Sequence, residues 1–149
     1  MSVEVRAPVS GVLCSLEDCG DAIFSMGALG WGVAIDPQRE AGSVLSPIDG
    51  KIERIRHHVF SLAQGRDAVI VQLGIKTENI KDEVYTMHKA TGDEVRTGDA
   101  IVSWDPAKIE AKGFVPMVLV VAMDRGPRGL IGLKEAGRVE AGDLLFTTS

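Results

Sequence analysis

VIVQLGIKT, residues 69–77, is the stretch that decides how this chain is expected to fold. Three β-branched residues precede Gln72, and the sequence Leu-Gly-Ile follows it, so a short apolar run ends in a glycine turn. Such a run predicts a β-strand that is buried on both faces of a sheet. The amide of Gln72 then needs hydrogen-bond partners or a cleft, because an unsatisfied buried polar group costs about 1–3 kcal/mol.

Apolar segments of similar length recur along the chain, separated by Gly, Pro and Asp residues. We expect strands at residues 31–36, 50–55, 68–75, 83–88, 100–104 and 117–123. Short strands at this spacing are typical of an all-β sandwich or barrel. A second helical turn is expected within residues 18–24, and residues 124–132 are interpreted as an exposed loop.

One short helix is predicted over residues 106–112. Asp105 can cap its N-terminus, and Pro106 suits its first position. Gly113 can end it. The chain therefore contains one or two short helices among many strands.

Two pairs of weak repeats suggest how the strands are organised. APVSG at 7–11 is similar to SPIDG at 46–50, and VRTGDAI at 95–101 is similar to VEAGDLL at 139–145. The first type is a proline that leads into a strand, and the second is a Gly-Asp turn that precedes an apolar strand. Two copies of each predict two interlocked β halves with approximate two-fold symmetry, because a solenoid would need more copies at a regular period.

Composition limits the class of protein. The 149 residues are expected to form a single domain, 1–149, with 45% hydrophobic and 25% charged residues. The net charge of −5 disfavours nucleic acid as a partner. No apolar run approaches the roughly 20 residues of a membrane helix, and the N-terminus lacks the apolar core of a signal peptide, so we expect a cytoplasmic protein without membrane insertion.

The two cysteines, Cys14 and Cys19, are too few to build a structural zinc site by themselves. They are interpreted as reduced thiols near a turn. We expect neither a metal nor a cofactor.

The repeats are shared by the barrel-sandwich hybrid folds, which include lipoyl and biotinyl carriers, glucose-type IIA proteins and some zinc peptidases. A carrier needs a lysine at the tip of an exposed hairpin, but Lys89 in MHKA leads directly into the turn at Gly92-Asp93. A zinc peptidase of this fold needs an H-x-H pair and a distant H-x-x-x-D motif. His57, His58 and His88 match neither spacing.

The chain resembles the glucose-type IIA proteins of the bacterial phosphoenolpyruvate-dependent sugar phosphotransferase system over about residues 5–147. Each motif is weak alone, but the order and spacing are those of the family. The matching segments are APVSGVLCSLEDCGDAIFS, GALGWGVAIDP at 27–37, SPIDGKI, HHVFSL at 57–62, VIVQLGIKT and VRTGDAIVSWD. The resemblance implies an all-β barrel-sandwich hybrid, also called the duplicated hybrid motif.

The resemblance also implies a phosphoacceptor histidine at the position of Gln72, in the family context V-H-[FL]-G-[IL]-D-T. A second histidine, which hydrogen-bonds the phosphoryl group, corresponds to His58. Transfer to imidazole uses a nitrogen lone pair, whereas the nitrogen of a glutamine amide has its lone pair delocalised into the carbonyl. Gln72 can bond to His58 and keep the local geometry, but it cannot carry a phosphate.

Other departures from the family lie nearby. Lys76 stands at the family's aspartate, where an arginine-rich partner docks, so its charge is expected to repel such a partner. Two glycines that follow the site in the family are replaced by Asp82 and Val84. Glycines near a phosphate site allow the backbone to approach closely. These changes favour natural divergence over a single laboratory substitution at Gln72.

The resemblance further implies a partner-binding face, to which we assign five residues: Phe24, Leu29, Trp31, Ile70 and Lys76. Phe24, Leu29 and Trp31 can equally belong to the core. An exposed Trp31 beside Gln72 would anchor a partner.

The expected function is that of a IIA component which has lost phosphotransfer and acts by protein binding. The alternative is an active phosphocarrier in sugar uptake that accepts phosphate on His58. By resemblance the partners are the histidine phosphocarrier protein and a sugar permease, together with a regulatory partner that the sequence does not name. The sequence identifies neither the sugar nor the oligomeric state.

Overall fold

The computed structural model describes residues 2–80 and 84–149, and in them the chain forms three antiparallel sheets. The largest sheet has the order β13-β2-β3-β11-β7-β6-β5-β9, and the smaller ones have the orders β1-β14-β12 and β4-β10-β8. The strands are β1 Glu4–Arg6, β2 Gly11–Ser15, β3 Gly30–Pro37, β4 Gly42–Leu45, β5 Gly50–Arg56, β6 Val59–Gln64, β7 Asp67–Leu73, β8 Tyr85–Met87, β9 Glu94–Val95, β10 Ala100–Trp104, β11 Val118–Met123, β12 Leu130–Ile131, β13 Arg138–Val139 and β14 Leu144–Thr148.

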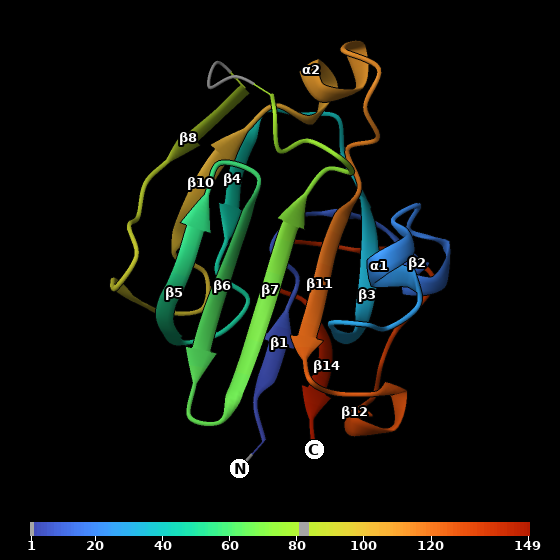
Figure 1. Ribbon diagram of the computed structural model, residues 1–149, viewed down its shortest axis with the longest axis vertical. Helices are drawn as coiled ribbons and strands as arrows, with labels where there is room; N and C mark the ends of the chain where they lie inside the picture. The colour runs from blue at the N-terminus through green and yellow to red at the C-terminus, as the bar shows by residue number, and fades with distance from the viewer. Residues whose placement is uncertain (1, 81–83) are drawn as a thin grey trace.

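The sheets pack as layers around one apolar core. In Figure 1 the large sheet faces the viewer, with β1 and β14 behind its lower half and β4 and β10 behind β5 and β6. Large side chains from several strands are fully buried between the layers, among them Phe60, Leu73, Ile101 and Phe146. Burying each contributes about 1.5–3 kcal/mol. The prediction of an all-β barrel-sandwich hybrid is confirmed.

The two halves are related by matching hydrogen bonds. The N–H of Arg6 donates to the carbonyl of Pro47, and the N–H of Leu45 donates to the carbonyl of Pro8, both at 2.9 Å. Each proline-led segment therefore bonds to the other half in the same way. This reciprocity is the approximate two-fold symmetry that the repeats predicted.

Three Gly-Asp turns have the same closure. In each, the aspartate side chain accepts a hydrogen bond from the backbone N–H three residues earlier, at 2.8 Å: Asp93 from Ala90, Asp99 from Arg96 and Asp143 from Glu140. The glycine before each aspartate has a φ of 94° or 95°, which a residue without a Cβ adopts readily.

The predicted helix is present as α2, Pro106–Ala111. The side chain of Asp105 accepts from the N–H of Lys108 at 3.3 Å, as an N-cap does. The helical turn expected at 18–24 is divided into a 3-10 turn at Leu16–Asp18 and the helix α1, Ala22–Ser25. None of the helices in residues 2–80 and 84–149 is long and apolar enough to cross a membrane.

Several predicted boundaries differ from the structure. The strand expected at 68–75 ends at Leu73, because Gly74 turns the chain with a φ of 94°. The strand expected at 83–88 is observed at Tyr85–Met87, and residue 83 lies outside the described residues. Strand β6 was not predicted, since its side chains do not form an obvious alternating pattern in the sequence.

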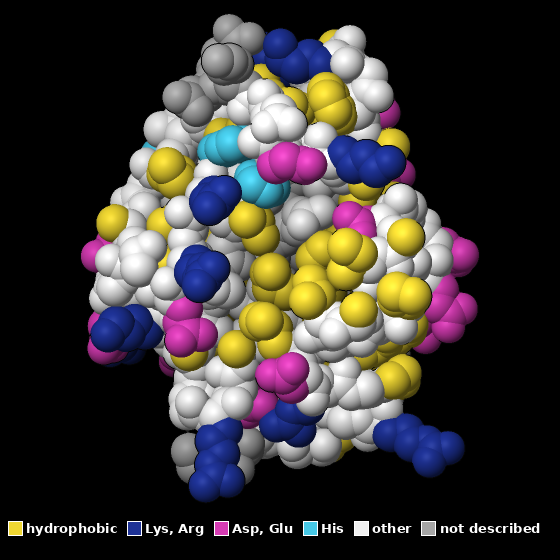
Figure 2. All heavy atoms as spheres, viewed as in Figure 1, with side chains coloured by type: hydrophobic (Ala, Val, Ile, Leu, Met, Phe, Trp, Pro, Cys, Tyr) yellow, Lys and Arg dark blue, Asp and Glu magenta, His cyan; other side chains and the backbone are white. Residues whose placement is uncertain are grey.

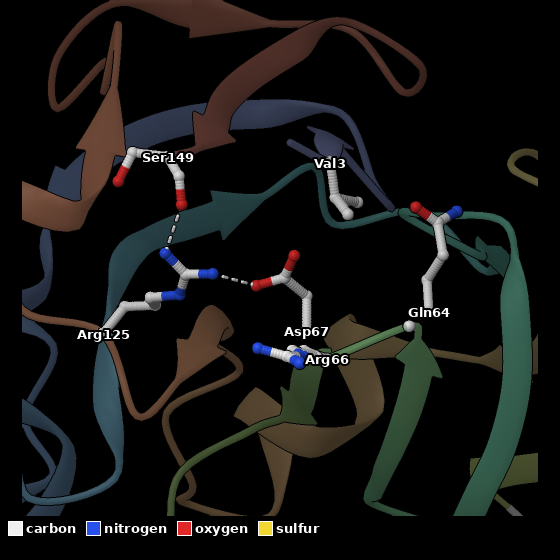
Figure 3. Close-up of a pocket in the computed structure, with 7 residues that line it drawn as sticks. Val3, Gln64, Arg66, Asp67, Arg125 and Ser149 are labelled. Atoms are coloured by element: carbon white, nitrogen blue, oxygen red, sulfur yellow. Dashed lines mark hydrogen bonds and ion pairs between the residues drawn. The ribbon is translucent and has the colours of Figure 1, made fainter. Parts of the chain in front are cut away.

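The interpretation of 124–132 as an exposed loop was wrong in part. Leu130 is buried, and β12 pairs with β14. Arg125 donates to Asp67 and, at 2.5 Å, to the backbone oxygen of Ser149 (Figure 3). Strand pairing and the bonds of Arg125 therefore hold this segment against the rest of the fold.

A hollow of about 350 Å³ adjoins that ion pair. Figure 3 shows Arg125 reaching between Ser149 and Asp67, with Val3 and Gln64 on the far side. Asp67 is 7% exposed, and its other carboxylate oxygen accepts from Thr148 at 3.3 Å. Each of its two carboxylate oxygens therefore has a partner within the fold.

Candidate functional site

Strand β7 has two different faces. Val69, Val71 and Leu73 are fully buried, whereas Ile70 and Gln72 are half-buried on the other face. The prediction of a strand buried on both faces was therefore wrong. The outer face of the large sheet is only partly covered, so Gln72 meets solvent there.

The residues across from Gln72 belong to the neighbouring strands. It pairs with Val59 of β6 on one side and with Leu119 of β11 on the other. Leu119 lies on this same face but is fully buried, whereas Val59 is only half-buried. Other parts of the chain therefore cover β11 more completely than β6.

The side-chain amide of Gln72 donates to the carbonyl oxygen of Gly74 at 3.1 Å. This bond keeps the amide beside the turn that ends the strand. The arrangement leaves a donor and an acceptor at the surface but no nucleophilic nitrogen.

Side-chain hydrogen bonds stabilise the turn that follows β7. The carbonyl of Leu73 accepts hydrogen bonds from the hydroxyls of Thr77 and Tyr85, each at 2.9 Å. Burial raises the pKa of Tyr85 to about 12, so its hydroxyl remains a donor at any physiological pH. A Cβ on Gly74 would collide with the Thr77 side chain. The turn requires glycine at this position.

His58 lies in the short hairpin turn between β5 and β6, and its carbonyl accepts from the N–H of Leu73 at 2.7 Å. Its ring centroid is 4.8 Å from that of His57. The Nδ1 atom is buried and has no hydrogen-bond partner among residues 2–80 and 84–149. The bond from Gln72 to His58 that we considered from the sequence is not formed, because the amide points to Gly74.

Charge and burial set the protonation of His58. Burial above all, and then the adjacent His57, lower the pKa of His58; Glu78 opposes this and Arg56 adds to it. The ring is therefore neutral at pH 7. His57 is held separately, with Nε2 at 3.4 Å from the carbonyl of Thr77 and its ring 5.1 Å from Tyr85.

A shallow cavity of about 280 Å³ opens beside His58 on the outer face. Its lining is part basic and part apolar, with Glu78 as the acidic member: Arg54, Arg56, His58, Val59, Phe60, Ser61, Ile70 and Glu78. Figure 2 shows this face, where cyan histidine side chains lie above an apolar area that has Lys and Arg side chains along one side.

The structure separates the residues assigned to partner binding. Ile70 is half-buried on the outer face with Gln72, and Lys76 is exposed in the following turn with a φ of 59°. Leu29 is partly buried against the core. Phe24 and Trp31 are buried at 5% and 9% exposure.

Trp31 cannot anchor a partner beside Gln72. It pairs with Ala122, which pairs with the fully buried Val69, so its side chain belongs to the inner face of the sheet. Its neighbours in β3, Gly30 and Gly32, have no room for a side chain, because a Cβ at either position would collide with a backbone carbonyl of β11. Trp31 is therefore a core residue.

Two exposed apolar residues at α1 were missed from the sequence. Ile23 and Met26, in and just after α1, are 57% and 74% exposed. Asp21 caps α1, and residues three apart share one side of a helix, so the spacing of this pair was a signal for a shared exposed side. Phe24, which we had assigned to partner binding, is buried in the core.

Of the two positions where the family motif has a glycine and this chain does not, the structure describes one. Val84 is buried, and its carbonyl accepts from the N–H of Asp105 at 3.2 Å. Asp82 lies outside the described residues. In the described part of the chain no three His, Cys, Asp or Glu side chains converge as metal ligands would.

A family model and several known proteins that match this chain all point to the same family. A family model described as the phosphoenolpyruvate-dependent sugar phosphotransferase system, EIIA 1, matches residues 3–126. The glucose-specific EIIA component of Haemophilus influenzae is 31% identical over 147 residues, which is 96% of this chain and 86% of that protein. That of Halalkalibacterium halodurans is 30% identical over 147 residues, or 97% and 84% of the two chains.

Longer relatives contain a similar segment. The chain spans 23% and 24% of the beta-glucoside-specific EIIBCA components of Halalkalibacterium halodurans and Bacillus subtilis, at 30% and 29% identity. Among solved structures, the glucose permease IIA from Mycoplasma capricolum superposes with a TM-score of 0.87 at 22% identity, over 99% of this chain and 96% of that one. This likeness shows that the fold is shared.

Proposed function

Because the chain belongs to the EIIA 1 family of the phosphoenolpyruvate-dependent sugar phosphotransferase system, we propose that it is a member which binds proteins without carrying phosphate. The observation that carries this proposal is Gln72. It occupies the outer face of β7, where the family motif has its acceptor, and its amide offers no lone pair for attack on phosphorus.

The surroundings of Gln72 support a binding role. The turn after β7 has a glycine at position 74 and two hydroxyl groups bonded to the carbonyl of Leu73, so the strand ends in a well-defined turn beside Gln72. The exposed Ile23 and Met26 add apolar surface on α1, in front of the same sheet in Figure 1. Exposed apolar groups of this kind often mark protein interfaces.

The proposed setting is the cytoplasm, with partners that follow from the family. The histidine phosphocarrier protein and a sugar permease would meet this face, and Lys76 would weaken the approach of a basic phosphocarrier. A protein fixed in the unphosphorylated form would act as a constant regulatory partner or as a decoy for one.

His58 supports a second candidate, a phosphocarrier that uses this residue. Its lowered pKa keeps the ring neutral at pH 7, and neutral imidazole has a nucleophilic nitrogen. Against this, histidines in such roles usually have the other ring nitrogen held by a hydrogen bond, which selects the tautomer. Nδ1 of His58 has no such partner in the described residues.

Radioactive phosphoenolpyruvate, with the two general phosphotransferase proteins, tests the proposal. We expect no protein-bound label on this chain, while the glucose-specific EIIA component of Haemophilus influenzae is labelled under the same conditions. Acid-labile label that disappears in His58→Gln would overturn the proposal and establish the second candidate. Label that persists in His58→Gln would also overturn it and place the acceptor elsewhere.

A further inference from the structure

Two arginines lie side by side on the outer face of the sheet. In β5, Arg54 pairs with Ser61 and Arg56 pairs with Val59. Val59 pairs in turn with Gln72, and Ser61 pairs with Ile70. Paired residues share a face, so both guanidinium groups flank the cavity beside His58.

Both arginines are exposed, and neither forms an ion pair with any residue in 2–80 or 84–149. Glu78 is the acidic residue of the cavity lining, so two cationic groups face one anionic group there. The whole chain has a net charge of −5. The charged lining of the cavity is therefore basic, although the molecule as a whole is acidic.

The same cavity has an apolar side. Val59 and Ile70 are half-buried beside the arginines on the outer face. Figure 2 shows apolar side chains grouped next to the basic ones on this face. A ligand that is only anionic would leave this surface exposed to water, whereas a peptide segment could cover both parts.

We propose that this face docks an acidic segment of a partner protein, with carboxylates on Arg54 and Arg56 and an apolar side chain over Val59 and Ile70. The proposal rests on the protein-binding function proposed above and specifies the chemistry of the partner. Arg54 and Arg56 are two residues apart in one strand, which places them roughly 6.6 Å apart along it. Carboxylates at alternate positions of an extended segment have the same spacing.

Charge complementarity explains why such a partner is selected. The two guanidinium groups attract a carboxylate-rich segment and repel a basic docking surface, of the kind that the family resemblance assigns to the phosphocarrier. Charge pairs at the rim of an interface mainly increase the rate of encounter and depend on salt. The apolar contact adds affinity that salt does not screen.

The test uses fluorescein-labelled nine-residue peptides and fluorescence polarisation with the full chain. The first probe is Gly-Leu-Ser-Glu-Ser-Glu-Ser-Leu-Gly, which places its Glu and Leu side chains on one face of an extended segment. Two further probes replace every Glu by Gln or by Arg. We expect the Glu peptide to bind about ten-fold more tightly than the Gln peptide at low salt, with a smaller difference at 0.5 M salt.

Variants locate the binding. Arg54→Gln with Arg56→Gln should abolish the preference for the Glu peptide, and Ile70→Ser should weaken the Glu and Gln peptides alike. Arg128→Gln with Lys134→Gln removes two exposed charges from another part of the surface and should leave binding unchanged. This double variant is the matched control for net charge.

Three outcomes would overturn the proposal: no binding of the Glu peptide, tighter binding of the Arg peptide, or unchanged binding by the Arg54 and Arg56 double variant. None of these bears on phosphotransfer, because the assay contains no phosphoryl donor. If His58 is labelled by phosphoenolpyruvate, the function proposed above fails whatever the peptides do. The two failures are thus distinguishable.

Discussion

Gln72 fits its strand and the following turn, and its side-chain amide offers no nucleophilic nitrogen. Its amide bonds to Gly74 and its neighbours across the sheet are Val59 and Leu119, so the strand and its turn need no adjustment. The nearby Lys76 adopts a φ of 59°, a left-handed conformation that Asp and Asn tolerate better than most residues. A carboxylate at position 76 would therefore fit the backbone that is already present.

This geometry gives a prediction for restoring transfer. Gln72→His alone should restore little phosphotransfer, because Lys76 still opposes a basic phosphocarrier. Adding Lys76→Asp should raise the initial rate of labelling by roughly ten-fold or more at low salt, since a charge reversal in a docking face acts on encounter. The measurement is the rate of label uptake from the phosphorylated phosphocarrier.

Gln72→His with Lys134→Asp is the control, because it makes the same charge change at an exposed position elsewhere. If Gln72→His alone is already a fast carrier with full stoichiometry, the docking face is intact. The differences at Lys76, Asp82 and Val84 would then be neutral.

His58 predicts a dependence of stability on pH. Its pKa in the folded protein is lowered, first by burial, so the unfolded chain binds a proton more readily near its ordinary pKa of about 6.5. This contribution to stability is complete above that value and is lost as the pH falls from about 7 through the lower folded pKa.

Urea unfolding between pH 8 and pH 5 checks this prediction. The free energy of unfolding should decrease toward pH 5 in the wild type and less steeply in His58→Gln. His88→Gln, at an exposed position, is the comparison. Equal slopes for His58→Gln and the wild type would show that protonation of His58 is not linked to folding.

At the scale of strands, two glycines of β3 have no room for a Cβ against the backbone of β11. A Cβ on Gly32 would meet the carbonyl oxygen of Val120, and one on Gly30 would meet that of Ala122. Both neighbours are backbone atoms of a central strand and cannot move without disturbing the sheet.

Gly32→Ala should therefore destabilise the protein by about 1–3 kcal/mol, the usual cost of overpacking. Gly42→Ala in β4 is the matched control, because a Cβ there would meet no atom within 4 Å. Urea unfolding of both variants gives the comparison. Equal midpoints would mean that β3 and β11 can separate at little cost.

Strand identity was easier to predict than strand exposure. The apolar run 69–77 indicated β7, and α2 followed from Asp105 and Pro106, because turn and cap residues act locally. Which face of β7 meets solvent depends on how far other segments cover it, and that is a property of the assembled layers. The same reason explains why Phe24 was chosen over the exposed Ile23 and Met26.

The position of 124–132 could not be predicted for a related reason. Its glycines and proline indicate a loop, and the stretch does contain a 3-10 turn at Pro127–Gly129. However, its place in the fold depends on Asp67, far away in the sequence, which accepts from Arg125. No local sequence pattern predicts that Arg125 pairs with Asp67.

At the scale of the whole molecule, the hydrogen bonds of Asp67 connect β7 of the large sheet with β14 of the sheet β1-β14-β12. Arg125 and Thr148 both donate to its carboxylate, and the N–H of Thr148 donates to Val3 at 2.9 Å. The pair is only partly screened, since the side chain of Arg125 is 27% exposed and that of Asp67 is 7% exposed. If the negative charge of Asp67 is removed, the guanidinium of Arg125 is left without its anionic partner and with little access to water.

Asp67→Asn should therefore lower the free energy of unfolding by about 1–3 kcal/mol. Hydrogen exchange should accelerate most at the amide of Thr148 and along β14. Glu135→Gln, which neutralises an exposed carboxylate, should change neither quantity. A uniform acceleration across all strands would contradict the local effect, because it would reflect global unfolding alone.

The three Gly-Asp turns have a consequence for the order in which the chain folds. Each is closed by a hydrogen bond between residues only three apart, whereas most strand pairs join distant parts of the sequence. Local loops close in well under a microsecond, and pairings between distant segments are slow. The turns at 90–93, 96–99 and 140–143 can thus form before the sheets and hold the ends of β9, β10, β13 and β14 ready to pair. If so, Asp99→Ala should slow refolding in stopped-flow experiments more than it speeds unfolding, and the reverse result would place these turns late on the pathway.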